Sequence, residues 1–79
     1  MDKTQPDTKT GPYYVTAKNE RGFHLMAGPY ARHEDALADV NRSRDIAYAR
    51  DRRAWFMTWG TTRIEGADHI GTLNKRGLI

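Results

Sequence analysis

The residues best suited to bind another molecule form one short run, Arg50-Asp51-Arg52-Arg53. A guanidinium group stays charged at physiological pH and donates hydrogen bonds in a planar fork that matches carboxylates and phosphates. From Arg42 to Arg53 there are five arginines and two aspartates, so this segment has a net charge of +3, the same as the whole chain. The pattern predicts an acidic partner. The alternative interpretation is a solvated, positively charged helix end, which suits the helix dipole.

The arginines lead directly into the most aromatic run of the chain, Trp55-Phe56-Met57-Thr58-Trp59. Aromatic, methionine and arginine side chains are the types enriched in the cores of protein interfaces. Rings beside arginines on an open sheet are also typical of surfaces that stack single-stranded bases. The signature of the RNA-recognition motif is absent, however, and a charge excess of +3 is small for a nonspecific nucleic-acid binder.

Residues for catalysis or metal binding are sparse. His24, His33 and His69 stand at wide, irregular spacing, and none has a second ligand at the i,i+4 spacing of a helical metal site. The chain has no cysteine, no serine in a Gly-x-Ser-x-Gly setting and no glycine-rich phosphate loop. We therefore expect a protein that is not an enzyme, with no catalytic residue, no bound metal and no cofactor.

The length of 79 residues predicts one small domain. A core of this size supplies only about 3–5 kcal/mol of net stability, and without cysteine no disulfide can add to it. Association with a partner or with a second copy is the remaining route. No apolar run approaches the ~20 residues of a membrane span, and no secretory segment is recognisable. We expect a soluble, intracellular protein with no membrane partner.

The residue pattern divides the chain into a disordered leader (1–11), a folded domain (12–65) and a loosely packed C-terminal tail (66–79). Two β-prone runs, 13–18 and 23–27, flank the turn Asn19-Glu20-Arg21-Gly22 and predict a hairpin. Gly28-Pro29-Tyr30 is expected to end the second strand, because proline cannot continue a ladder of hydrogen bonds.

A helix is predicted from about His33 to Ala49, although no capping side chain precedes it. Its core-facing stripe is Ala36, Val40, Ser43 and Ala47. A third strand is predicted from Ala54 to about Thr62. These elements form a ββαβ unit of the α+β class, with a three-stranded antiparallel sheet in the order 2-1-3 and one helix on one face.

Alternation along the strands predicts which side chains face the helix. The inward set is Tyr13, Val15, Ala17, Phe23, Leu25, Ala27, Trp55, Met57 and Trp59. The outward set places Tyr14, Met26 and Phe56 on an uncovered sheet face, where they would form an apolar patch. With the arginines, this patch gives the predicted partner-binding residues: Tyr14, Met26, Phe56, Arg42, Arg50, Arg52 and Arg53. Coverage of that face by the tail is the alternative.

One resemblance bears on function. The segments Gly28-Pro29-Tyr30-Ala31-Arg32-His33-Glu34-Asp35-Ala36-Leu37, Gly60-Thr61-Thr62-Arg63 and Gly71-Thr72-Leu73-Asn74 resemble a group of small proteins found on phages, prophages and plasmids. The likeness spans residues 13–63, about two-thirds of the chain, and its motif is structural. This chain departs from the pattern at Arg32, where a Thr cap is usual. Some mobile-element proteins of this size are anti-CRISPR proteins.

The resemblance implies an inhibitor of a type I, in particular type I-C, CRISPR surveillance complex (Cascade) in the cytoplasm of a bacterial host. Such a protein would act by binding the complex, not by catalysis, and would block target DNA from loading. Two alternatives stay open from the residues themselves. One is a nucleic-acid-binding accessory protein of a mobile element, and the other is a homodimeric interaction module.

Overall fold

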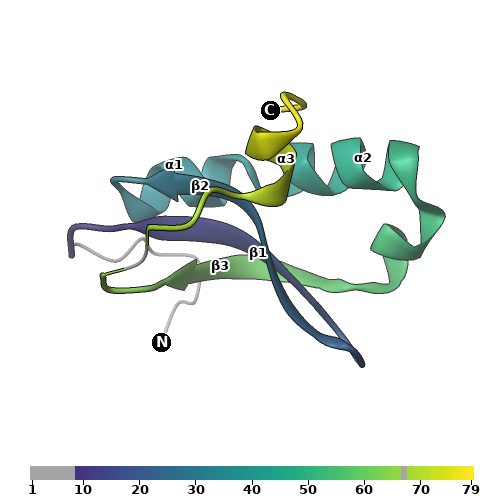
Figure 1. Cartoon of the computed structure of the whole chain (residues 1–79), viewed down its shortest axis with the longest axis horizontal. Coiled ribbons are helices and arrows are strands. Elements are labelled where there is room, and N and C mark those ends of the chain that lie inside the picture. Colours follow the sequence, from purple (N-terminus) through teal and green to yellow (C-terminus); the bar gives the residue numbers. More distant parts are fainter. Residues whose placement is uncertain (1–8, 67) are drawn as a thin grey trace.

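A computed structural model describes residues 9–66 and 68–79 and contains a three-stranded antiparallel sheet. Its strands are β1 (Tyr13–Asn19), β2 (Gly22–Tyr30) and β3 (Thr58–Arg63). The order is β2-β1-β3, with β1 antiparallel to both neighbours, so the predicted α+β class and strand order are confirmed. The helices α1 (His33–Ala38) and α2 (Val40–Arg50) lie together above the sheet (Figure 1).

The predicted single helix is divided at Asp39, between α1 and α2. Asp39 is held from a neighbouring strand, because the Tyr30 hydroxyl donates to its Oδ2 at 2.7 Å. The stripe of small residues packs as predicted, with Ala36, Ser43 and Ala47 buried. As the sequence indicates, no side chain caps the start of α1 at Arg32.

The core lies between this helical layer and the central strand β1. Tyr13, Val15 and Ala17 of β1 are all buried. Tyr13 stacks on the His33 ring with centroids 4.8 Å apart, and His33 Nε2 lies 2.7 Å from Thr61 Oγ1. Since His33 belongs to α1, these contacts show that the odd-numbered residues of β1 face the helices, as predicted.

The predicted facing of β2 is wrong for Phe23, His24 and Leu25 but right for Ala27, which is buried and pairs with Val15. The strand does not end at Gly28 but continues to Tyr30, because β2 is an edge strand and the missing N–H of Pro29 can point away from the ladder. Its register to β1 shifts near Val15, and below that shift Ala17 pairs with His24. Directly paired residues share a face, so His24 lies on the helical side and Phe23 on the other.

The third strand begins four residues later than predicted. Arg52–Phe56 form a short 3₁₀-helix, η1, and β3 begins at Thr58. Asp51 starts η1 because its Oδ1 accepts a hydrogen bond from the backbone N–H of Arg53 at 3.0 Å. Trp55 and Phe56 therefore lie on a helical turn and not on the sheet.

The C-terminal residues are packed more tightly than predicted. Leu73, in the short helix α3 (Thr72–Lys75), is only 3% exposed. The preceding Gly71 lies against Ala27 so closely that a Cβ there would be 2.5 Å from Ala27 Cα. Figure 1 shows α3 beside β2 on the side of the helices.

The predicted leader is described only from residue 9 onward, and residues 1–8 lie outside the described part. Residues 9–11 are hydrogen-bonded to the domain. Gly11 N–H donates to the Ala31 carbonyl at 2.8 Å, and the Thr10 carbonyl accepts from Arg63 Nε at 2.7 Å. Within the described ranges, no helix has the length and apolar character needed to cross a membrane.

Candidate functional site

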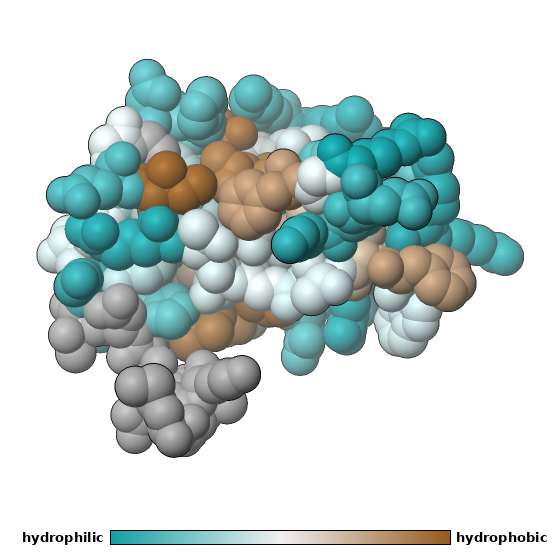
Figure 2. Space-filling view, turned by 90° about the horizontal axis from the view of Figure 1, so that it is seen from below, coloured by the Kyte–Doolittle hydropathy of each residue, from teal (hydrophilic) through white to brown (hydrophobic). Residues whose placement is uncertain are grey.

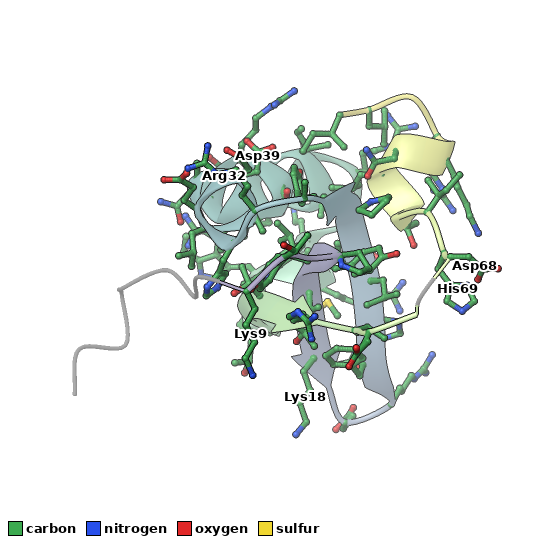
Figure 3. The ribbon with its side chains drawn as sticks, turned by 90° about the vertical axis from the view of Figure 1, so that its left-hand side faces the viewer. Lys9, Lys18, Arg32, Asp39, Asp68 and His69 are labelled. Carbon is green, nitrogen blue, oxygen red and sulfur yellow. The ribbon has the colours of Figure 1, made fainter. Side chains whose placement is uncertain are left out.

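The predicted apolar patch on the open sheet face is not formed. Tyr14 is fully buried, and its hydroxyl donates to the His69 carbonyl at 2.5 Å. The segment with Asp68 and His69 approaches the sheet before it enters α3, and both side chains project outward (Figure 3). From below, Figure 2 shows brown and tan residues side by side from the upper left to the middle of the view, and further ones set apart among teal and white residues. The C-terminal tail therefore covers Tyr14 on the face of the sheet that points away from the helices.

Four of the predicted partner-binding residues instead meet in one groove on the opposite side of the sheet. The groove has a volume of about 650 Å³ and lies between the β1–β2 hairpin, the end of α2, η1 and α3. Met26, Phe56, Arg50 and Arg53 line it. The shifted register of β2 brings Met26 to this side, because it reverses the facing that simple alternation predicts.

The 3₁₀ geometry of η1 decides which residues reach the groove. A 3₁₀-helix has about three residues per turn, so side chains three positions apart share a side. Arg53 and Phe56 form one such pair and line the groove, whereas Arg52 and Trp55 form the next pair and do not. Phe56 is 85% exposed, although it is a large apolar side chain.

The walls of the groove are apolar. Met26 of β2 and Met57 after η1 contribute thioethers, and α3 with the residues after it contributes Leu73 and Leu78. Ala47 and Ala54 leave room between them. Methionine side chains adapt to partners of different shape, which suits a binding surface more than a fixed core.

The rim is positively charged. Four arginines from four parts of the fold line the groove, namely Arg21, Arg50, Arg53 and Arg76, against the carboxylates of Glu20 and Asp51. Asp51 is paired with Arg53 at 2.8 Å. In the described part of the chain, no ion pair involves Arg21, Arg50 or Arg76. Three guanidinium groups are thus available to an anionic partner.

The pair of Asp51 and Arg53 orders the groove wall formed by η1. Arg53 Nε donates to both Asp51 carboxylate oxygens at 3.1 Å, and its Nη2 donates to Oδ2 at 2.8 Å. The side-chain hydrogen bonds from Arg53, followed by the one from its backbone N–H, lower the pKa of the Asp51 carboxyl. The same contact raises the pKa of Arg53, so both groups stay charged.

The other side of η1 carries a second aromatic surface. Trp55 lies against Tyr48 of α2 with ring centroids 5.4 Å apart. The Arg44 guanidinium lies 5.3 Å from the Trp55 ring centroid, so it has a cation–π partner on η1. Trp55 and Tyr48 remain partly exposed, and Arg52 is exposed beside them in the chain.

The remaining predicted residue, Arg42, lies on α2 outside the groove lining and pairs with Asp39 at 3.6 Å. Sequence reasoning missed Arg21, Arg76, His24, Leu73 and Leu78. Arg21 lies in the predicted turn, and the others lie in the predicted second strand or in the C-terminal tail. Nothing in the local sequence indicates that these segments come together in the fold. One signal was present in the sequence: Asp51 is a residue type that often caps the start of a helix. It could have indicated that Phe56 lies on a helical turn and not on a strand.

Among residues 9–66 and 68–79, no group of three or more His, Asp or Glu side chains could hold a metal ion. Comparison with known proteins gives no matching family model, no matching curated protein and no matching solved structure.

Proposed function

We propose that this chain is a non-enzymatic inhibitor that binds a type I CRISPR surveillance complex and keeps target DNA from loading. The observation that carries the binding part of this proposal is the groove. Exposed Phe56 lines it together with Arg21, Arg50 and Arg76, three arginines that form no ion pair with the described residues. The choice of partner follows from the resemblance of residues 13–63 to small proteins of mobile elements.

Such an inhibitor would use the groove as the centre of a larger contact. Phe56 supplies an aromatic anchor, which is typical of the residues that dominate binding energy. Arg50 and Arg76 would engage acidic side chains of the complex or its guide RNA, since guanidinium groups bind both carboxylates and phosphates. Inhibition then requires only that the bound protein occupies space or charge that target DNA needs.

The test measures loading of target DNA onto a purified type I surveillance complex by electrophoretic mobility shift. Wild-type protein is expected to reduce loading in a concentration-dependent way. Phe56→Ala should lose about tenfold or more of this potency, because truncation of a central aromatic anchor commonly costs about 2 kcal/mol. Phe23→Ala is the matched control, since Phe23 is 50% exposed but lies outside the groove lining. DNA loading that is unaffected by wild-type protein would refute the proposal.

A second function is favoured by the surface around Trp55, where the partly exposed rings of Trp55 and Tyr48 lie against each other and the Arg44 guanidinium lies over the Trp55 ring. Such surfaces suit the stacking of single-stranded bases. The test is direct binding of a fluorescent single-stranded oligonucleotide at increasing salt. Binding that weakens steeply with salt and is lost in Trp55→Ala would favour a nucleic-acid-binding accessory protein. A melting temperature that rises with protein concentration would instead indicate a homodimer.

A further inference from the structure

The groove has two chemical zones that together restrict what it can receive. Its walls present Met26, Met57, Leu73 and Leu78, and these favour apolar side chains that leave water. Its rim presents guanidinium groups from the hairpin turn, the end of α2 and the segment after α3. A complementary ligand must therefore be apolar along one side and acidic along its edges.

We infer that the groove receives an acidic, amphipathic peptide segment of a partner protein. The inference rests on the proposed use of the groove for binding and names the kind of segment that enters it. Recognition of this kind places the apolar face of a segment into a groove and leaves its charged positions at the rim. Here the charged positions would be Asp or Glu, facing Arg21, Arg50 and Arg76.

The volume of the groove agrees with a short segment. About 650 Å³ lies within the roughly 300–1,000 Å³ of sites that enclose small ligands. A space of this size accommodates a few side chains, but it does not accommodate the whole interacting surface of a folded domain. A full interface buries about 800 Å² per partner, so the segment would anchor a contact that continues outside the groove.

Nucleic acid fits the groove less well than a peptide does. Stacking of bases needs several exposed ring faces, and among the described residues of the lining only Phe56 and His24 carry rings. A phosphate backbone laid over Met26 and Met57 would lose water without gaining a polar contact from them. The arginines alone would attract phosphates, but the apolar walls between them favour a ligand with apolar side chains.

A second copy of this chain is also a poor occupant. Each copy has a formal net charge of +3, so self-association brings like charges together near a positive rim. An acidic segment of another protein avoids this repulsion between like charges, and its carboxylates can pair with the rim arginines that have no ion pair. Because the rim arginines are exposed, this attraction should weaken as salt rises.

The test is a selection of displayed random peptides against the full-length protein, with counter-selection against a folded Phe56→Ala/Arg50→Glu variant. The survivors are expected to carry Asp or Glu around two or more large apolar residues. A synthetic survivor should lose about tenfold or more in affinity with Phe56→Ala and with Arg50→Glu separately. Phe23→Ala and Arg52→Glu, which lie outside the groove lining, should bind it like wild type.

Three results would overturn the inference. The first is a set of survivors that are basic or neutral, and the second is the survival of no peptide after counter-selection. The third is an oligonucleotide that competes for the groove with higher affinity than any survivor. The inference and the proposed function fail separately. Acidic peptides that bind the groove while DNA loading is unaffected would refute the inhibitor role alone. If wild type and Phe56→Ala inhibit loading equally and the selection yields no acidic peptide, the inference of a peptide ligand is refuted but the inhibitor role is not.

Discussion

At the scale of single residues, one carboxylate arranges the proposed binding surface. Asp51 begins η1 through the Arg53 backbone N–H and holds the Arg53 guanidinium by further hydrogen bonds. This local clamp turns the chain into a 3₁₀-helix where hydrophobicity alone predicts a strand. Phe56 consequently points to the groove and stays 85% exposed.

Asp51→Asn should weaken the clamp, because the amide keeps an acceptor but loses the charge that pairs with Arg53. The pKa of Asp51 is lowered in the folded protein, so the stability that it contributes is present above its unfolded pKa of about 3.9. This contribution is lost as the pH falls through the folded pKa. Thermal melts from pH 7 downward should show wild type more stable at neutral pH, with the difference beginning to shrink below about pH 4 and disappearing in stronger acid. A difference that persists in strong acid would contradict the assignment.

Tyr30 gives a prediction at the other end of the pH scale. Partial burial, followed by its hydrogen bond to Asp39, raises the pKa of the Tyr30 hydroxyl. A raised folded pKa contributes stability that is complete below the unfolded value of about 10 and is lost as the pH rises beyond it. Tyr30→Phe should cost about 1 kcal/mol at neutral pH. In denaturant titrations, this cost should shrink above about pH 10, and a constant cost would refute the explanation.

At the scale of elements, the C-terminal segment closes the free edge of β2 and builds part of the groove. Gly71 N–H donates to the Gly28 carbonyl at 3.0 Å, Asn74 Oδ1 accepts from Gly28 N–H at 2.9 Å, and Thr72 Oγ1 donates to the Leu25 carbonyl at 3.2 Å. These bonds satisfy edge groups that could otherwise pair with another chain. Leu73 is buried by the same docking.

Gly71→Ala should undock this segment. The added Cβ would meet backbone atoms of Ala27 at 2.5–2.7 Å, and these cannot give way as a flexible side chain could. We expect a loss of about 1–3 kcal/mol in the free energy of unfolding, measured by denaturant titration. Gly60→Ala is the control, since nothing lies within 4 Å of its Cβ position. Equal stability of the two variants would contradict the described packing.

The strand order and the buried stripe of the helix were predictable, whereas the surface was not. Tyr13, Val15 and Ala17 alternate regularly because β1 pairs with β3 without any shift. The facing of β2 depends on its irregular pairing near Val15, which is a property of two strands together and leaves no local signal. The burial of Tyr14 depends on a segment 55 residues later in the chain.

At the scale of the whole molecule, the arginines and rings noticed in the sequence are divided between two sides of η1. Arg53 and Phe56 join a groove that also needs the hairpin turn and the C-terminal segment. Arg52 and Trp55 belong to the other surface. A short chain thus assembles its proposed binding groove from segments that are distant in sequence, and docking of the C-terminal segment becomes a condition for binding.

The most direct measurement is amide hydrogen exchange of the full-length protein, alone and with the purified surveillance complex. Binding through the groove predicts slower exchange in β2 near Met26, in η1 and in α3, with little change along β3. Slower exchange confined to β3 or to α1, or no change in any element, would contradict the assignment of the groove as the binding surface.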